Sequence, residues 1–227
     1  MVFTVPLRVL LLGIVLLSCI QSVVNEDVDM NTLTRIQKFF HDNYYNGGQY
    51  AVATNVPQQQ CRSGFYPTRR NFLTLDPSAT VKPLIQRDSM YVYRGTELIA
   101  AGVHRDAHSE HLLMNPPNTS PLTNLMNTNR DGCVVFYTLN SPCISRCLNN
   151  NYINNIIQGL NKLNAYQGIK AFVFSNIFTN DQNSQNLRTE LQKIADRVPL
   201  YRCNYGSCIL CGQPGSNIPV IDQCLIT

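Results

Sequence analysis

The sequence predicts a layered α/β domain, because segments with strand and helix character alternate along it. Residues 133–139 and 171–177 are continuous apolar runs, which are typical of strands buried in the centre of a sheet. Apolar side chains at helical spacing lie between these runs, and others lie between the second run and a short strand at 198–203. This strand–helix–strand order predicts parallel strands joined by right-handed crossovers.

The N-terminal part of this domain is expected to begin with a helix and a strand. Residues 30–44 carry apolar side chains at helical spacing, and two glycines follow soon after them. Residues 49–55 have the composition of a short strand. Residues 57–88 show little periodicity and contain several prolines, so we expect a long connecting insert that Cys61 ties to the domain.

Shorter elements are expected in the middle of the chain. Residues 90–101 have the pattern of a bent strand or small hairpin. Residues 107–114 are predicted to form a helix, and residues 115–131, rich in Asn, Pro, Ser and Thr, a loop. Pro142 is expected to open a further helix, and a last helix is predicted at 187–195.

An apolar run near the N-terminus has the features of a secretory signal. Residues 9–20 are apolar and follow Arg8, but they are too few to span a membrane. We therefore divide the chain into a signal peptide at 1–24, a domain at 25–203 and a cysteine-rich tail at 204–227. The prediction is a secreted, extracellular protein with no membrane association after signal removal, and a retained signal-anchor is the alternative.

The charge of the chain excludes one class of function. There are 18 Lys and Arg against 14 Asp and Glu, a net charge of +4. A dedicated duplex-DNA-binding protein usually shows a strong basic stripe, and the sequence has none. Asn118 begins an acceptor sequon for N-glycosylation, which suits an exported protein.

The cysteines predict disulfides. The chain has nine, of which Cys19 belongs to the expected signal peptide. The other eight would normally be read as disulfide partners in an exported protein. If Cys143 and Cys147 bind a metal instead, the sequence does not choose among the pairings of the remaining six. These six are Cys61, Cys133, Cys203, Cys208, Cys211 and Cys224.

A histidine, a glutamate and two cysteines form the pattern H-x-E…P-C-x-x-x-C. Zinc prefers nitrogen and sulfur ligands in a tetrahedron, and a catalytic zinc keeps one position open for water. His108, Cys143 and Cys147 are therefore predicted to hold zinc, with both sulfurs on one face of the helix that Pro142 opens. The common zinc-deaminase signature is H-x-E…P-C-x-x-C, so one extra residue stands between the cysteines here.

Glu110 is predicted to be the catalytic residue. It lies two residues after His108, beside the place where a zinc-activated water would stand. Its carboxylate would take a proton from that water and pass it to the leaving amine. Such a site hydrolyses the exocyclic amine of a base, converting cytosine to uracil or adenine to hypoxanthine.

Each part of the pattern also has a simpler interpretation. The two cysteines of the pattern could be disulfide cysteines in an oxidising compartment. The three histidines between residues 104 and 111 could form a polar helix face. The C-x-x-C at 208–211 could indicate redox chemistry, but it lies in the tail and not at a strand-to-helix junction, which favours disulfide staples.

The same residues carry a family resemblance. The His-Ser-Glu at 108–110, the strand Phe-Tyr-Thr-Leu-Asn at 136–140 and the Ser-Pro-Cys at 141–143 resemble the cytidine deaminase superfamily, and most of all its AID/APOBEC branch. With the signal and the further cysteines, the chain looks most like the secreted AID/APOBEC-like deaminases of vertebrates. The resemblance covers roughly residues 30–203. It implies a three-layer α/β fold with a five-stranded mixed sheet flanked by helices.

The resemblance also implies the rim of a base pocket. By their order along the chain, Asn55, Tyr137 and Ser141 would line it, and Phe178 would lie in the specificity loop, where it could stack on a base. The implied cofactor is zinc, and the implied substrate is cytosine in a nucleoside or in single-stranded nucleic acid. The alternative is an extracellular binding or immune-interaction protein of the same fold, with structural zinc and no catalysis. The sequence predicts no oligomeric state.

Overall fold

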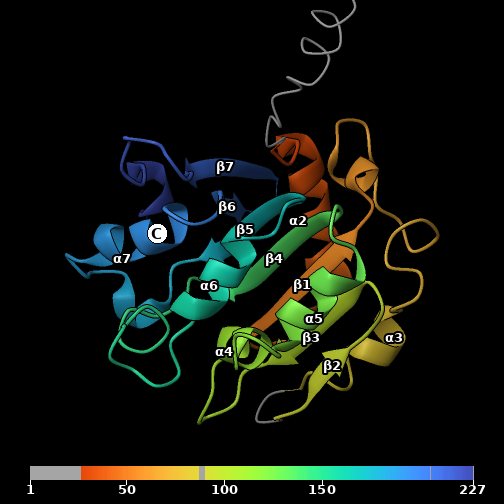
Figure 1. The fold of residues 1–227 in the computed structure, drawn as a ribbon, viewed down its shortest axis with the longest axis horizontal. Helices are drawn as coiled ribbons and strands as arrows, with labels where there is room; N and C mark the ends of the chain where they lie inside the picture. The colour runs from red at the N-terminus through yellow and green to blue at the C-terminus, as the bar shows by residue number, and fades with distance from the viewer. Residues whose placement is uncertain (1–26, 87–89, 205, 227) are drawn as a thin grey trace, which may run out of the picture.

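One mixed sheet of seven strands forms the centre of the computed structural model, which describes residues 27–86, 90–204 and 206–226 (Figure 1). Its order is β2-β3-β1-β4-β5-β6-β7. The strands are β1 (Tyr50–Val56), β2 (Val92–Arg94), β3 (Leu98–Gly102), β4 (Cys133–Asn140), β5 (Ile169–Asn176), β6 (Leu200–Asn204) and β7 (Ser207–Gly212). The expectation of five strands was wrong, because the predicted hairpin supplies two separate strands and the predicted tail supplies β7.

The directions of the central strands follow from their connections. β4, β5 and β6 are parallel neighbours, and a helix lies between each strand and the next along the chain. All the other neighbours are antiparallel. The alternation of strand and helix therefore predicted the parallel part of the sheet correctly, because parallel neighbours require long crossovers.

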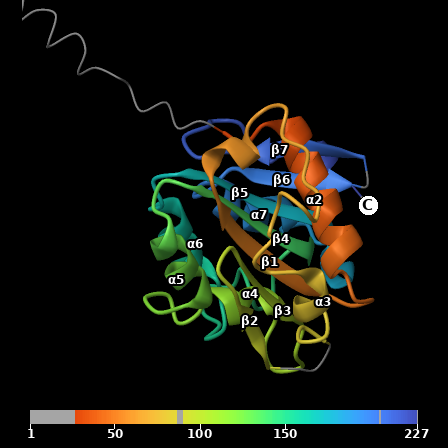
Figure 2. The same ribbon diagram turned by 90° about the vertical axis from the view of Figure 1, so that its right-hand side faces the viewer.

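Helices cover both faces of the sheet (Figure 2). On one face, α2 (Met30–Tyr44) buries Leu33, Ile36 and Phe40 against the sheet, as its apolar periodicity predicts. The core on the other face contains side chains of four helices, α4 (Ser109–Met114), α5 (Pro121–Thr128), α6 (Ile157–Asn164) and α7 (Leu187–Ala195). The predicted α/β fold, with helices on both sides of one mixed sheet, is confirmed.

The side chains of β4 alternate between these two cores. Val134 and Phe136 belong to the core under α4–α7, whereas Val135 and Tyr137 belong to the core under α2. The two-residue period of a strand makes this division unavoidable. It decides which residues near the end of β4 can reach α4, and Thr138 is one of them.

The segment 115–131, which we expected to be a loop, contains the helix α5. Ser120 caps this helix, because its hydroxyl oxygen accepts a hydrogen bond from the Thr123 N–H at 3.0 Å. Pro121 occupies the first turn, where its missing N–H costs nothing. A capping serine followed by proline is typical of the start of a helix. We overlooked it because the segment is rich in asparagine and threonine, which are common in loops.

The long insert is fastened to the sheet at two points. It contains η1 (Gln58–Cys61) and the short helix α3 (Ser78–Val81). Cys61 forms a disulfide with Cys133 at the start of β4, as expected for a tie through Cys61. The buried Asp76 carboxylate accepts hydrogen bonds from three consecutive backbone N–H groups in the β2–β3 hairpin, at 2.7–3.2 Å.

The other two disulfides belong to the C-terminal segment. Cys203–Cys208 links β6 to β7, and Cys211–Cys224 links β7 to η3 (Asp222–Cys224). The two cysteines of the C-x-x-C at 208–211 therefore bond to other cysteines and not to each other. This agrees with the prediction of structural disulfides in place of a redox motif. Residues 204–227 include an edge strand of the sheet, paired with β6 along its length.

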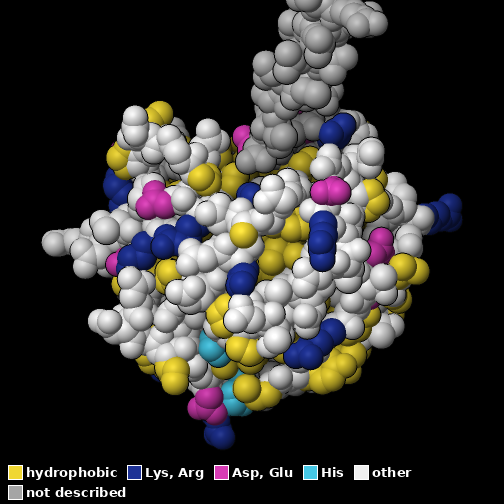
Figure 3. Space-filling view, in the orientation of Figure 1, with side chains coloured by type: hydrophobic (Ala, Val, Ile, Leu, Met, Phe, Trp, Pro, Cys, Tyr) yellow, Lys and Arg dark blue, Asp and Glu magenta, His cyan; other side chains and the backbone are white. Residues whose placement is uncertain are grey.

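Charged side chains are spread over the part of the surface that Figure 3 shows. On the face in Figure 3, Lys and Arg side chains lie in separate groups among uncharged ones and form no continuous stripe. Within the described ranges, none of the helices combines the length and the apolar composition that crossing a membrane requires. The expected signal peptide lies outside the described residues.

Candidate metal centre and its carboxylate

Three side chains meet beyond the carboxyl end of β4. Nδ1 of His108 lies 3.4 Å from Sγ of Cys143 and 3.3 Å from Sγ of Cys147, and the two sulfurs are 3.6 Å apart. Both cysteines are buried. In the part of the chain that the structure describes, they are the two that form no disulfide. The structure thus brings together all three predicted ligands.

The donor set and its spacing fit zinc. Zinc–sulfur bonds of about 2.3 Å and zinc–nitrogen bonds of about 2.0–2.1 Å place tetrahedral ligands about 3.5–3.8 Å apart. The three observed separations of 3.3–3.6 Å are close to that range. The extra residue between Cys143 and Cys147 therefore does not prevent their sulfurs from converging. One imidazole and two thiols leave one tetrahedral position for a further ligand.

The cysteines lie in a turn and not at the start of a helix, so the expectation of a helix at Pro142 was wrong. The first helix after β4 is α6, which begins at Ile157. Two other contacts shape the turn: the Leu148 N–H donates to the Cys143 carbonyl at 3.1 Å, and the Ile144 N–H donates to the Asp181 carboxylate at 2.9 Å. Local hydrogen bonds, not a helix dipole, thus position the sulfurs.

The two thiols differ in acidity because they share a hydrogen bond. The hydrogen bond between the two sulfurs lowers the pKa of Cys143, and His108 lowers it further. The same interaction and burial raise the pKa of Cys147. The hydrogen bond to Cys143 also raises the pKa of His108, although burial opposes it. Cys143 is therefore the natural thiolate of the pair, and a thiolate is the form that binds metal.

Glu110 lies in the first turn of α4, two residues after His108, which is the N-cap of that helix. Its side chain is 1% exposed. Oε1 accepts a hydrogen bond from the Thr138 hydroxyl at 2.7 Å and one from the Gln49 amide at 3.2 Å. Burial raises the pKa of the Glu110 carboxyl, although His108 and the Thr138 hydrogen bond oppose the shift. A carboxyl with a raised pKa is suited to exchanging protons near neutral pH.

Two of the predicted rim residues lie at this site. The Ser141 hydroxyl oxygen accepts a hydrogen bond from the Phe178 N–H at 3.0 Å, which joins the loop after β5 to the turn that carries Cys143. The Phe178 ring lies beside His108, with 6.3 Å between the ring centroids. Phe178 is partly exposed, so its ring is available for contact beside the three ligands.

Asn55 is not brought to the site. It faces the same side of the sheet as the site but lies at the other end of β1, paired with Val134, whereas Ala51 pairs with Thr138. Four residues of strand separate these levels, about 13 Å. The Asn55 amide donates to the main-chain carbonyls of Leu125 and Asn129, each at 2.8 Å. These contacts hold α5 on the sheet, so the order along the chain pointed to the wrong end of β1.

Tyr137 lies near the correct end of the sheet but on the wrong face. Its ring packs against Phe40 and Tyr50 in the core under α2, with centroid separations of 5.9 and 5.7 Å. Its hydroxyl lies 3.0 Å from the Ser175 hydroxyl. The sheet therefore separates Tyr137 from Glu110, and Thr138, one residue later, takes the place that we had expected Tyr137 to occupy.

Gln49 and Thr138 are site residues that the sequence interpretation missed. The Gln49 amide donates to the Thr138 hydroxyl at 2.8 Å as well as to Glu110, and its carbonyl accepts from the Asn140 N–H at 3.0 Å. The sequence contained an indication for each of them. Both are polar, and the alternation of side chains along a strand places both on the face that α4 covers. Recognising it required knowing that β1 begins where β4 ends.

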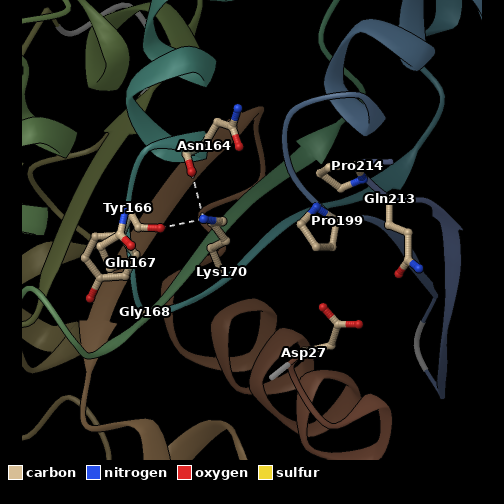
Figure 4. A pocket seen from close by; sticks show the side chains of 9 residues that line it. All are labelled: Asp27, Asn164, Tyr166, Gln167, Gly168, Lys170, Pro199, Gln213 and Pro214. Carbon is tan, nitrogen blue, oxygen red and sulfur yellow. Dashed lines mark hydrogen bonds between the residues drawn. The ribbon is translucent and has the colours of Figure 1, made fainter. Parts of the chain in front are cut away.

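A cavity of about 320 Å³ lies at the other end of the sheet, near the starts of β5 and β6 (Figure 4). It is lined by residues such as Asp27, Tyr166 and Lys170, and none of the candidate site residues borders it. The Lys170 ammonium donates to the carbonyls of Asn164 and Tyr166, just after α6. The lysine is thereby satisfied by main-chain groups, and the cavity does not belong to the metal centre.

An α/β sheet with a His–Cys–Cys group beside a buried glutamate is the arrangement expected of the deaminase class. Comparison with protein families agrees. Residues 30–226 match the model of the family described as Secreted Novel AID/APOBEC-like Deaminase 1, so the chain belongs to this family. No curated protein and no solved structure gave a significant match. The AID/APOBEC-like resemblance is thus confirmed, and it extends through the C-terminal segment.

Proposed function

We propose that this protein is an exported, zinc-dependent deaminase that hydrolyses the exocyclic amine of cytosine. One observation carries the proposal: in a chain of a deaminase family, six described cysteines are paired, and the two left free converge on His108 next to Glu110. The other six described cysteines are already bonded, so Cys143 and Cys147 could form a disulfide only with each other, and their sulfurs are 3.6 Å apart, well beyond a disulfide bond of about 2.05 Å.

The chain supplies the groups that hydrolysis needs. Zinc bound by His108, Cys143 and Cys147 would lower the pKa of a water molecule toward neutrality. Glu110 carries two protons in turn on its carboxylate: the first passes from that water to the ring nitrogen, and the second passes from the hydroxyl group now on the ring carbon to the departing amine. The carbon–nitrogen bond of the amine breaks, a carbon–oxygen bond forms, and ammonia leaves. The raised pKa of Glu110 favours both halves of this exchange.

The base would lie against Phe178. Its ring is beside His108 and is anchored by the hydrogen bond to Ser141, so a planar base next to the metal centre would meet an aromatic face. The modest net charge of +4 and the separated basic groups fit a nucleoside or a short single strand better than duplex DNA. Salt dependence of binding separates the two substrates, because contacts with phosphates release counterions and a free nucleoside makes none.

Export is part of the proposal. The family description is that of a secreted protein, and the apolar run at 9–20 has the length of a signal core. Three disulfides suit an oxidising compartment. Recovery of the processed chain, beginning near residue 25, from the medium of expressing eukaryotic cells would support this part, and exclusive recovery of the full-length chain inside cells would contradict it.

The experiment that tests the function compares the wild type with Glu110→Ala. Zinc content is measured first, and then deamination of cytidine, deoxycytidine and single-stranded oligonucleotides containing cytosine or adenine. We expect about one zinc per chain in both proteins and product from the wild type alone. A zinc-loaded wild type with no Glu110-dependent product on any of these substrates refutes the proposal.

The second candidate is a binding protein with structural zinc. The burial of Glu110 favours it, because a carboxylate that is 1% exposed, with its Oε1 bonded to Thr138 and Gln49, meets no substrate without a movement of the rim. On this hypothesis a chelator unfolds the protein, while Glu110→Ala does not change its binding function. Zinc-dependent turnover would eliminate it.

A further inference from the structure

Gln49 joins three parts of the candidate site with one side chain. Its amide nitrogen donates to Oε1 of Glu110 at 3.2 Å and to the Thr138 hydroxyl at 2.8 Å. Its amide oxygen accepts from the Asn140 N–H at 3.0 Å, three residues before Cys143. A glutamine just before β1 thereby connects the carboxylate on α4 to the strand end that leads into the thiol turn.

Thr138 completes this group from the neighbouring strand. Its hydroxyl lies 2.7 Å from Oε1 of Glu110 and 3.1 Å from the Asn140 carbonyl oxygen. A hydroxyl has one proton and two lone pairs, so it can serve both states of the carboxyl. It donates to Oε1 of an ionised Glu110, and Oε1 still accepts this hydrogen bond when the carboxyl carries its proton on Oε2. The contact therefore survives when the proton on Glu110 comes and goes.

The two oxygens of Glu110 are held unequally. Oε1 accepts hydrogen bonds from Thr138 and Gln49, one of them at 2.7 Å, whereas the Ser109 hydroxyl lies 3.3 Å from Oε2. We propose that Gln49 and Thr138 are positioning residues that immobilise Oε1 of Glu110, so that Oε2 is the oxygen that exchanges the proton with substrate and water. This inference rests on the proposed deaminase function and adds the residues that aim its proton carrier.

Positioning of this kind affects turnover more than binding. Neither Gln49 nor Thr138 needs to touch the base, so their loss leaves ground-state binding largely intact. A misplaced carboxylate slows proton transfer, and an error of about 1 Å in a reacting group can cost about 10²-fold in rate. The expected signature is a lower kcat with an almost unchanged KM.

The test uses the secreted, zinc-loaded protein. Its variants remove the hydrogen bonds while keeping the size and shape of the side chains similar. Thr138→Val and Gln49→Met should each lower kcat by about 10–100-fold at similar KM and zinc content. Thr138→Ser keeps the hydroxyl and should recover most of the lost kcat. Matched controls are Thr54→Val and Gln60→Met, which remove side-chain hydrogen bonds to the Glu97 and Asn71 carbonyls away from the site. Both controls should retain the wild-type kcat.

A second readout does not depend on turnover. The thermal unfolding midpoints of Thr138→Val, Glu110→Gln and the double variant form a cycle, and direct contact predicts clear non-additivity. The cycle keeps the inference testable if Thr138→Val folds poorly, because Gln49→Met, which removes the other hydrogen bond to Oε1 of Glu110, can take its place. Additive midpoint shifts would overturn the inference, as would an unchanged kcat in both Thr138→Val and Gln49→Met.

Failure of the inference is distinguishable from failure of the proposed function. If the wild type turns over cytosine and the two variants match it, the function stands and the positioning role is overturned. If the wild type is folded, zinc-loaded and inactive on every substrate, the proposed function is overturned and the positioning role falls with it. Coupling in the unfolding cycle, together with a lower kcat that Thr138→Ser restores, supports the inference.

Discussion

Cysteines lie near both ends of β4, but they are disulfide-bonded at one end and free at the other. At its start, Cys133 is locked to Cys61 in a disulfide. Beyond its end, Cys143 and Cys147 keep free thiols beside a histidine. The same strand thus carries a structural cysteine at one end and candidate metal ligands at the other, and the identity of the residues alone does not separate the two roles.

The buried polar groups at these ends also differ. Near the start of β4, the Asn55 amide is saturated by the Leu125 and Asn129 carbonyls, so it holds main chain in place. Near the end, the Glu110 carboxylate is held by other side chains, those of Thr138 and Gln49, and burial raises its pKa. A polar group satisfied by main chain is part of the architecture, whereas a titratable group held by side chains remains free to change its protonation.

The largest expected effect that tests this comparison is on metal binding. Cys147→Ser should weaken zinc binding by more than the roughly 10–100-fold that changes around a metal site usually cost, because a ligand itself is lost. Zinc per chain is measured by mass spectrometry of the native protein. The matched change at the other end, Cys133→Ser with Cys61→Ser, should leave the zinc content intact. Loss of zinc from that control, or wild-type zinc affinity in Cys147→Ser, would contradict the assignment of a structural role to Cys133 and a metal-binding role to Cys147.

Removal of the metal should expose two thiols and destabilise the fold. A bound ion present at about 1,000 times its Kd contributes about 4 kcal/mol to the free energy of unfolding. A chelator should therefore lower the thermal midpoint clearly. It should also make two cysteines of the processed chain reactive toward a thiol reagent, because the other six are paired. If no thiols react after chelation under denaturing conditions, Cys143 and Cys147 are in disulfides and the metal centre does not exist.

Loss of the Cys61–Cys133 disulfide should have the next largest effect on stability. It closes a loop with a sequence separation of 72, against 5 for Cys203–Cys208. We expect the double change to serine to lower the free energy of unfolding by about 2–5 kcal/mol, because the unfolded chain regains loop freedom. Removing Cys203–Cys208 should cost less. Denaturant titrations measure both, and an equal or reversed order would show that strain or residual structure outweighs loop length.

Phe178→Ala should separate binding from chemistry at the carboxyl end of β4. Loss of a stacking ring costs about 1–3 kcal/mol per base, which corresponds to a rise in KM or Kd of about 5–150-fold. The zinc content should not change, because Phe178 contacts His108 through its ring alone. Binding of cytidine and of a short oligonucleotide to Phe178→Ala and to wild type provides the measurement. An unchanged KM would remove Phe178 from the substrate pocket.

The smallest effect on catalysis is expected from a change near the start of β4, opposite the candidate site. Asn55→Ala removes the two hydrogen bonds to the Leu125 and Asn129 carbonyls and should cost about 1–3 kcal/mol of stability. Deamination by the folded fraction should not change, because Asn55 lies about 13 Å along β1 from the level of Thr138. Unfolding curves and kcat at a temperature where the variant is folded test both parts. A drop in kcat without a loss of stability would return Asn55 to the active site.

Much of the site could be predicted because its chemistry is rare. A histidine, a glutamate and two cysteines were singled out from the sequence, and the structure places their side chains together at one end of the sheet. The errors concern neighbours chosen by order along the chain. Asn55 has the right face and the wrong end, and Tyr137 has the right end and the wrong face. The first error concerns how β1 pairs with β4, and the second concerns the face of the sheet to which a strand residue points. Neither can be read from the local sequence.

The amino-acid sequence by itself determined the local features of this protein: the apolar periodicity of α2 and α7, the buried runs of β4 and β5, and the ligand types of the metal centre. These depend on residues a few positions apart, whose spacing is visible in the chain. Only the tertiary structure decided that β7 joins the sheet, that six cysteines pair, and that Gln49 meets Glu110. Such contacts join segments many residues apart, and the packing of the whole sheet selects them.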